Sequence, residues 1–229
     1  MRSQGVVIAA TGLRAEARIA ERSPGVVAVA GGGAEAQLTQ LIEAEITKGA
    51  SGIISFGIAG AIDPSLHPGT CVVGKAVIDN GRWNPSDERW ADRLIAALPD
   101  ATSGALVGVS KALAEVDAKR ALRDATGALA VDMESHVVAR LAKAHELPFA
   151  VLRVIADTAD QRLPPAAVNG LKPDGSPALG AVLKSLALEP GQLPDLIRTA
   201  FAARRAMAEL LRCHRLLGPG LGFGLVDLG

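Results

Sequence analysis

Aromatic side chains and net charge are both scarce in this sequence of 229 residues. Aromatic residues make up 3% of it, Tyr is absent, and the formal net charge is zero. Few aromatic rings are available to stack on bases, and no excess of positive charge would attract a phosphate backbone. We therefore expect no nucleic-acid partner.

Cysteine is also rare, and no long apolar run is present. The two cysteines, Cys71 and Cys213, are too few for a disulfide framework and lack the spacing of metal ligands, and the histidines form no metal-binding motif. The first apolar run, GVVIAATGL, is followed at once by charged residues, which favours a buried strand over a signal sequence. The sequence contains no run of about 18 apolar residues, which is the length that a helix needs to span a membrane. We expect a reduced, cytoplasmic protein without a metal.

The apolar residues fall into short runs that alternate with helical patterns. Hydrophobic residues make up 49% of the chain. Strands are predicted at residues 5–10, 25–33, 51–62, 69–79, 128–133 and 148–157, and helices at 14–22, 34–49, 88–99 and 134–146. Such alternation is typical of α/β proteins with a parallel sheet. We predict a single α/β domain over residues 1–229, with three α/β/α layers around a mostly parallel, mixed sheet.

The last third of the chain has a different composition. Residues 162–194 are rich in proline and glycine and predict a long ordered loop, over a site or at an interface. A helix is predicted at about residues 195–217, where apolar residues repeat along one stripe and five arginines add positive charge. The stripe packs either on the core or on a second subunit, or it forms a basic amphipathic surface against a membrane or a lipid substrate.

Two turns that follow predicted strands carry residues suited to anions or to catalysis. Gly31, Gly33 and Ala36 fit the G-x-G-x-x-A pattern, but the next strand does not end in the acid that a dinucleotide-binding loop needs for the ribose. The glycines form either a plain tight turn or a helix start that holds an anion. Arg14 and Glu16 follow the first strand, where an arginine can bind phosphate and a glutamate can activate water, unless both belong to a solvated helical turn.

Acidic residues follow two other predicted strands. Asp132 and Glu134 flank Met133, and because they are two positions apart only one of them readily faces a given pocket. Asp157 ends an apolar strand, and burial there would raise its pKa, as a proton donor requires. Asp160 has the spacing of a turn or helix-start residue and is expected to be structural. The pattern alone leaves open whether these acids cap helices or catalyse a reaction.

Three segments together resemble the superfamily of purine nucleoside phosphorylases and methylthioadenosine/adenosylhomocysteine nucleosidases. They are SFGIAGAIDPSLHPGTCVVG (55–74), AVDMES (130–135) and PFAVLRVIADTADQ (148–161), and the similarity extends over about residues 5–161. Residues 162–229 are similar to the hopanoid-associated phosphorylase branch. The resemblance implies a nucleoside phosphorylase-like fold, a purine nucleoside as substrate, and a homo-oligomer, with a dimer favoured.

The resemblance also implies roles for individual residues. Glu134 matches the glutamate that binds the ribose hydroxyls, and Met133 matches the methionine that packs on the sugar. Asp157 matches the acid that protonates N7 of the purine, and an aspartate at this position favours adenine nucleosides. Asp132 is then expected to be structural. Substrate contacts are further expected from three loop residues, Gly57, Ala59 and Gly60.

The attacking group is left open between phosphate and water. Arg14 resembles the phosphate-binding arginine of the phosphorylases, with Gly12 and Gly33 as further ligands. Ile58, however, stands where those enzymes use a hydrogen-bonding residue. Glu16 is alternatively similar to the glutamate with which the hydrolases activate water. Apart from inorganic phosphate as a co-substrate, no cofactor is implied.

The resulting hypothesis is cleavage of the N-glycosidic bond of an adenine nucleoside, by phosphorolysis or hydrolysis. An apolar chain with a proline-rich flap and a basic amphipathic helix suits a lipid-linked nucleoside, and adenosylhopane of hopanoid biosynthesis is the favoured substrate. Peripheral contact of the C-terminal helix with a membrane would fit that substrate. The alternatives are a methylthioadenosine/adenosylhomocysteine nucleosidase, a general purine nucleoside phosphorylase, and a nucleoside-binding protein without activity.

Overall fold

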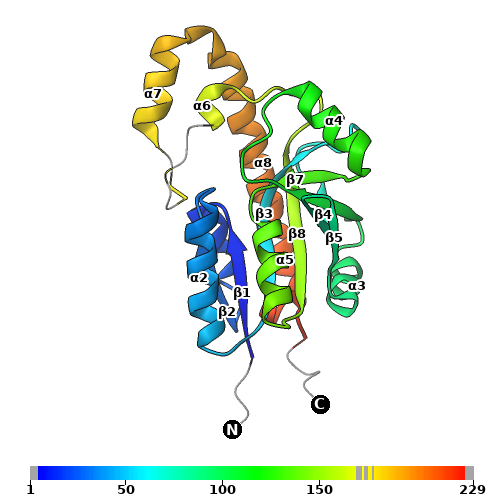
Figure 1. The fold of residues 1–229 in the computed structure, drawn as a ribbon. Coiled ribbons are helices and arrows are strands. Elements are labelled where there is room, and N and C mark those ends of the chain that lie inside the picture. The colour runs from blue at the N-terminus through cyan, green and yellow to red at the C-terminus, as the bar shows by residue number, and fades with distance from the viewer. Residues whose placement is uncertain (1–4, 169–171, 173–174, 177, 225–229) are drawn as a thin grey trace.

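The structure, a computed structural model, describes residues 5–168, 172, 175–176 and 178–224. They form one mixed sheet with helices on both of its faces, which confirms the predicted single-domain α/β fold (Figure 1). The strands are β1 (Val6–Thr11), β2 (Val26–Ala30), β3 (Ala50–Ala61), β4 (Cys71–Asp79), β5 (Arg82–Pro85), β6 (Thr102–Gly108), β7 (Ala130–Asp132) and β8 (Phe149–Asp157).

The central strand of the sheet is β3. Its 12 residues pair in parallel with β1 and β8, and antiparallel with β7. Because β8 also pairs with β4, β4 with β6, and β6 with β7, the strands β3, β8, β4, β6 and β7 close into a ring. The sheet extends from β1 to β2 on one side and from β4 to β5 on the other. Every residue of β8 is buried, which explains why its sequence is apolar except for Arg153 and the final Asp157.

Two sets of helices cover the sheet. The longer helices are α1 (Arg14–Ala20), α2 (Glu35–Thr47), α3 (Glu88–Ala97), α4 (Val116–Thr126), α5 (Ser135–Ala144) and α8 (Leu193–Leu217). On one face α1, α3 and α8 share a core with the sheet around Trp90 and Leu210. On the other face α2 and α5 pack Ile42 and Val138 against the sheet, in front of it in Figure 1. α4 packs Leu122 against residues of β6 and β7.

The prediction of a long loop at residues 162–194 is wrong for much of the segment. It contains α6 (Pro165–Val168), α7 (Leu179–Leu188) and the short helix η1 (Pro190–Gln192). α7 forms because its sequence, LGAVLKSLAL, consists mostly of good helix formers, and the neighbouring prolines lie outside it. Residues 169–171, 173–174 and 177 of the segment lie outside the described residues.

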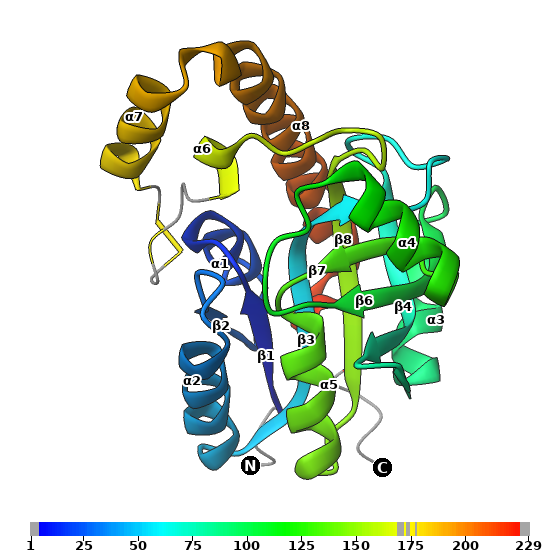
Figure 2. The same ribbon diagram turned by 45° about the horizontal axis from the view of Figure 1, so that its top comes forward.

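The C-terminal helix α8 begins at Leu193, two residues before the predicted start, and ends at Leu217. Its apolar residues do not form a single stripe. The second half packs Ala206, Leu210 and Cys213 into the core, whereas Ile197 and Phe201 of the first half are exposed. Figure 2 shows this first half beside α6 and α7, on the side of the molecule away from both chain ends. Within the described part of the chain, no helix combines the length and apolar character needed to cross a membrane.

Candidate active site

A cavity of about 490 Å³ lies where β1, β3, β7 and β8 end. Backbone and acidic side chains form one side of it, and the acids include Glu16, Glu134 and Asp157. The other walls are mostly apolar and come from α6, α7, α8, the loop before α6 and the loop between β6 and α4: Val109, Ala112, Leu113, Leu163, Ala166, Ala167, Val182, Leu196, Ala200 and Ala203. Strand ends in open α/β sheets are common ligand sites, and here they place carboxylates at the edge of an apolar chamber.

Arg153 on β8 balances the acidic side of the cavity. Its side chain is fully buried. Nε lies 2.8 Å from Oδ2 of Asp132, and Nη2 lies 3.0 Å from Oε2 of Glu134. Buried carboxylates need such a partner because they have lost their hydration. Arg153 was not among the predicted site residues, although a lone charge inside the apolar strand FAVLRVIAD is a sequence signal for it.

The two acids of AVDMES have different surroundings. Oδ1 of Asp132 accepts the backbone N–H groups of Glu134 at 3.3 Å and Ser135 at 2.9 Å, so Asp132 fixes the turn that leads from β7 into α5. Glu134 lines the cavity, and a Cβ added at Gly12 would lie 2.6 Å from its Oε1. Only glycine at position 12 leaves room for this carboxylate. Both acids border the cavity and pair with Arg153, but Asp132 also binds the backbone before α5, whereas Glu134 occupies the space that Gly12 leaves free.

Glu16 on the first turn of α1 also lines the cavity. Its Oε2 accepts the backbone N–H groups of Gly12 at 2.9 Å and Leu13 at 2.7 Å, and its Oε1 accepts that of Ile58 at 2.8 Å. Burial raises the pKa of Glu16, while Arg153 and these hydrogen bonds oppose the rise. Backbone amides that could hold an external anion thus already hold a carboxylate.

The expected substrate contacts on β3 separate into two kinds. Ala59 and Gly60 line the cavity, and Gly57 does not. A Cβ at Gly57 would lie 2.6 Å from Oε1 of Glu16, and one at Gly60 would lie 3.0 Å from Oδ2 of Asp157. The missing side chains at these two glycines let both acids approach the strand.

The residues predicted to bind phosphate do not gather in one place. Gly12 and Gly33 line the cavity, but Arg14 is exposed and is not part of its lining. The N–H groups of Gly31 and Gly32 donate to backbone oxygens at the end of β1, each at 2.9 Å. A Cβ at Gly33 would lie 3.1 Å from Cε of Met133, which lines the cavity as well. The turn at Gly31–Gly33 is therefore hydrogen-bonded to the end of β1, and few of its backbone N–H groups remain to bind an anion.

Asp157 is the last residue of β8 and lines the cavity. Burial raises the pKa of its carboxyl group, and the nearby ammonium group of Lys119 opposes the rise. Nζ of Lys119, a fully buried residue of α4, lies 2.5 Å from Oδ2 of Asp157. Asp160 is exposed and accepts a hydrogen bond from Oγ1 of Thr158. No sequence motif had indicated Lys119.

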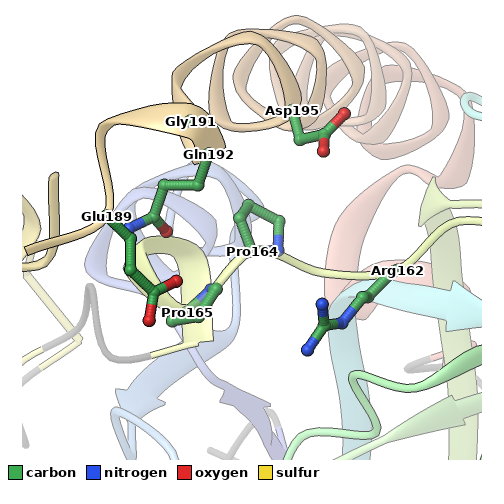
Figure 3. Close-up of a pocket in the computed structure, with 7 residues that line it drawn as sticks. All are labelled: Arg162, Pro164, Pro165, Glu189, Gly191, Gln192 and Asp195. Carbon is green, nitrogen blue, oxygen red and sulfur yellow. The ribbon is translucent and has the colours of Figure 1, made fainter.

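A second hollow, of about 280 Å³, lies beside α6, η1 and the start of α8 (Figure 3). It is lined by Arg162, Pro164, Pro165, Glu189, Gly191, Gln192 and Asp195. Its charged side chains are exposed, and Arg162 pairs with Glu115 at 3.0 Å. Since none of the buried acids borders this hollow, we assign the chemistry to the larger cavity.

Comparison with known proteins places the chain among the enzymes that cleave nucleosides, the nucleoside phosphorylases and nucleosidases. More narrowly, it belongs to the Phosphorylase superfamily, whose family model matches residues 6–186. The matched range includes every acid that lines the cavity and ends before α8. No curated protein matches the chain.

Solved structures of bacterial nucleosidases share the fold. The S-adenosylhomocysteine nucleosidase of Streptococcus pyogenes in complex with 5-methylthiotubericidin is 17% identical, with a TM-score of 0.67, over 93% of this chain and 98% of that one. The futalosine hydrolase of Helicobacter pylori is 14% identical, with a TM-score of 0.66, over 94% of this chain and 99% of that one. At these identities the likeness establishes a common fold.

Proposed function

We propose that the enzyme hydrolyses the N-glycosidic bond of an adenine nucleoside that carries a large apolar group at C5′. The observation that carries this proposal is the cavity, in which three buried carboxyl groups, those of Glu16, Glu134 and Asp157, face an apolar chamber. Adenosylhopane is the favoured substrate, and adenine and a ribosyl hopane of hopanoid biosynthesis are the products. Side chains supply the acid, the base and the ribose ligand, so the reaction requires no cofactor.

Asp157 is the proposed general acid. As the bond between C1′ and N9 breaks, its electron pair moves into the purine, and the carboxyl proton of Asp157 passes to N7. Adenine then leaves as a neutral base, which lowers the barrier. The reaction needs a carboxyl group that keeps its proton near neutral pH, and burial raises the pKa of Asp157 in that direction.

Glu134 and Glu16 are proposed to act on the sugar side. The Glu134 carboxylate accepts hydrogen bonds from the ribose hydroxyls while Met133 packs on the sugar. Glu16 takes a proton from water, whose oxygen bonds to C1′ as the ribosyl cation forms. Three backbone N–H groups hold the Glu16 carboxylate, so its position is set before substrate binds.

Water is favoured over phosphate by the charges of the cavity. A phosphate ion would enter beside Glu16 and Glu134, and the guanidinium group of Arg153 already pairs with two carboxylates. An anion site at a helix start also needs free N–H donors, and those beside α1 are bonded to Glu16. Arg14 is exposed and does not line the cavity, so it adds no positive charge to the cavity lining. Phosphorolysis would require these partners to rearrange.

The apolar chamber is the proposed site of the 5′ substituent. Its walls include Ala166 and Ala167 of α6 and Val182 of α7. The side-chain amide of Gln192 ties these two helices together, since Oε1 accepts the N–H of Ala166 at 3.0 Å and Nε2 donates to the backbone oxygen of Ser185 at 2.9 Å. A hydrocarbon group bound between such walls is removed from water, which favours binding.

Narrowing the chamber should discriminate against large substrates. Val182→Trp adds an indole ring on the α7 wall, away from the acids, so kcat/KM for adenosylhopane is expected to fall roughly tenfold or more. Methylthioadenosine, whose 5′ group is small, should be cleaved at a rate within about twofold of the unmodified enzyme. Adenine release from both nucleosides, measured in the same detergent solution, gives the comparison.

The matched control for this change is Ala187→Trp, on the exposed side of the same helix and outside the cavity lining. It should leave both rates unchanged. Equal losses for the two nucleosides with Val182→Trp would mean that the chamber does not hold the 5′ group. The proposal of a large apolar substituent would then be abandoned.

Binding of the nucleoside should weaken as the pH falls below about 7. Burial raises the pKa of Glu134 to about 7, with Arg153 opposing the shift and Asp132 and Glu16 adding to it. The ionised form accepts hydrogen bonds from both ribose hydroxyls, and it is lost as the pH falls through the raised pKa. KM should therefore rise roughly tenfold per pH unit on the acid side. A 2′,3′-dideoxy analogue should lack this dependence, and an equal dependence for both would contradict the ribose contact.

The main alternative substrate is methylthioadenosine or adenosylhomocysteine. It is supported by the shared fold with an S-adenosylhomocysteine nucleosidase. The apolar walls from α6, α7 and α8 favour a larger 5′ group. Faster turnover of methylthioadenosine than of adenosylhopane by the unmodified enzyme would select the alternative.

The outer faces of α6, α7 and α8 support the predicted contact with a membrane. Exposed large apolar side chains gather there: Val168, Leu183, Leu188, Leu193, Ile197 and Phe201. A lipid-linked nucleoside must leave a bilayer to enter the chamber, and the same helices form the chamber wall. The cytoplasmic location and the homodimer stay predictions.

A further inference from the structure

Lys119 is the only buried lysine in the described part of the chain. Its Nζ donates to Oδ2 of Asp157 at 2.5 Å, to the backbone oxygen of Thr158 at 2.8 Å and to that of Gln161 at 3.0 Å. These acceptors match the three N–H donors of an ammonium group. A lysine is rarely buried without such pairing, so the structure holds this side chain as a charged, fully bonded group.

The contact with Lys119 distinguishes the two oxygens of Asp157. Oδ2 is bonded to the ammonium group, whereas no hydrogen bond from the described residues reaches Oδ1. Gly60 has no side chain, and a Cβ there would lie 3.0 Å from Oδ2 and 3.2 Å from Oδ1, so this glycine leaves room for the whole carboxyl group. Asp157 also borders the cavity. The carboxyl group is therefore fixed on one side by Lys119 and left with one oxygen for a ligand.

We propose that Lys119 is the positioning residue of the acid: it orients Asp157 with Oδ1 toward the purine and stabilises the carboxylate left by proton transfer. The inference rests on the proposed function. Before the step Asp157 is neutral and Lys119 is an ammonium ion. After the step the proton is on N7, Asp157 is an anion, and Lys119 has kept its proton. The attraction therefore grows as the bond between C1′ and N9 breaks, which lowers the barrier in a buried site.

The same ammonium group has a second, structural contact that a test must separate from the first. Thr158 and Gln161 belong to the loop after β8, and Nε2 of Gln161 donates to Oγ1 of Thr199 on α8 at 3.0 Å. Lys119→Gln removes the charge but keeps N–H donors for the backbone oxygens. Lys119→Met fills similar space without donors. Both variants are made, so that the test can be carried out if only one of these uncharged variants folds.

With Lys119→Gln, kcat/KM for adenine release should fall about 10- to 100-fold, the effect of losing one charge-assisted hydrogen bond in the transition state. The alkaline limb of the pH profile should also move to higher pH, because the ammonium group lowers the pKa of Asp157. A purely structural role would reduce thermal stability without moving this limb.

Lys119→Arg, which keeps the charge, should keep the limb near its original position. Lys143→Gln, at an exposed lysine of α5, is the matched control.

An activity-independent measurement keeps this inference separate from the proposed function. The pKa of Asp157 in the substrate-free protein, followed by carbon-13 NMR of its carboxyl group, should be higher in the neutral variants than in the unmodified protein. Equal pKa values, or an unchanged rate and alkaline limb with Lys119→Gln, would overturn the role of Lys119. Loss of adenine release with Asp157→Asn would still support the proposed function in that case.

Discussion

Replacing Asp157 by asparagine is expected to abolish adenine release while the protein stays folded. Asparagine has nearly the same shape but no acidic proton, so N7 cannot be protonated as the glycosidic bond breaks. The loss of a general acid typically costs about 10²- to 10⁴-fold in rate. Chromatography of released adenine measures the rate, and circular dichroism measures folding. Some loss of thermal stability is expected because the buried ammonium group of Lys119 loses its acidic partner.

The matched control is Asp160→Asn in the loop that follows β8. Asp160 is exposed, bonds to Thr158 and does not line the cavity, so its replacement should leave the rate unchanged. Near-normal turnover by Asp157→Asn would remove this residue from the mechanism. Equal losses in both variants would assign the effect to the loop rather than to the acid.

Replacing Arg153 by methionine is expected to have the largest effect on stability. Arg153 is fully buried and pairs with Asp132 and Glu134, and its charge also acts on Glu16. Breaking a buried ion pair by removing one partner costs about 3–5 kcal/mol. In a domain of this size that loss lowers Tm by about 10 °C. Thermal unfolding followed by circular dichroism tests this.

The loss of stability caused by Arg153→Met should also depend on pH. Without the guanidinium group, the pKa values of Glu16 and Glu134, which burial already raises, rise further in the folded state. A carboxyl group with a raised folded-state pKa stabilises the fold at low pH, and this contribution is lost as the pH rises through that pKa. The variant should therefore be closer to the unmodified protein at acid pH than at alkaline pH.

Arg198→Met is the control for this change, because Arg198 is exposed and its ion pair with Asp195 spans 3.3 Å at the surface. Surface pairs contribute little, so Tm should hardly change. If the two arginine variants melted at the same temperature, Arg153 would not be the group that holds the carboxylates in place.

Elements with a strong apolar pattern were predictable from the sequence, and those without one were not. β8 is apolar apart from Arg153 and Asp157, because every residue in it is buried. α4 has no such stripe, since Lys119 is its one buried residue among those described. β6, with the sequence TSGALVG, is short and weakly apolar and was not predicted. Pattern reasoning detects burial of apolar groups, and α4 is held partly by a buried charge.

The site was predictable to the extent that its residues follow strand ends. Glu134, Met133 and Asp157 all line one cavity, as their positions after β7 and β8 suggested. Lys119 could not be inferred because it reaches Asp157 across 38 residues, and only the fold brings α4 to the end of β8. Arg14 was expected beside Glu16, but residues two apart on a helix point to different sides, and only Glu16 faces the cavity.

The most direct test of the proposed function is the product formed from adenosylhopane with and without phosphate. In phosphate-free buffer we predict release of adenine together with a ribosyl hopane, identified by mass spectrometry, and added phosphate should change neither the rate nor the product. Adenine release only in the presence of phosphate, with a phosphoribosyl hopane as product, would contradict hydrolysis by Glu16-activated water. No adenine release from adenosylhopane under either condition would contradict the proposed substrate.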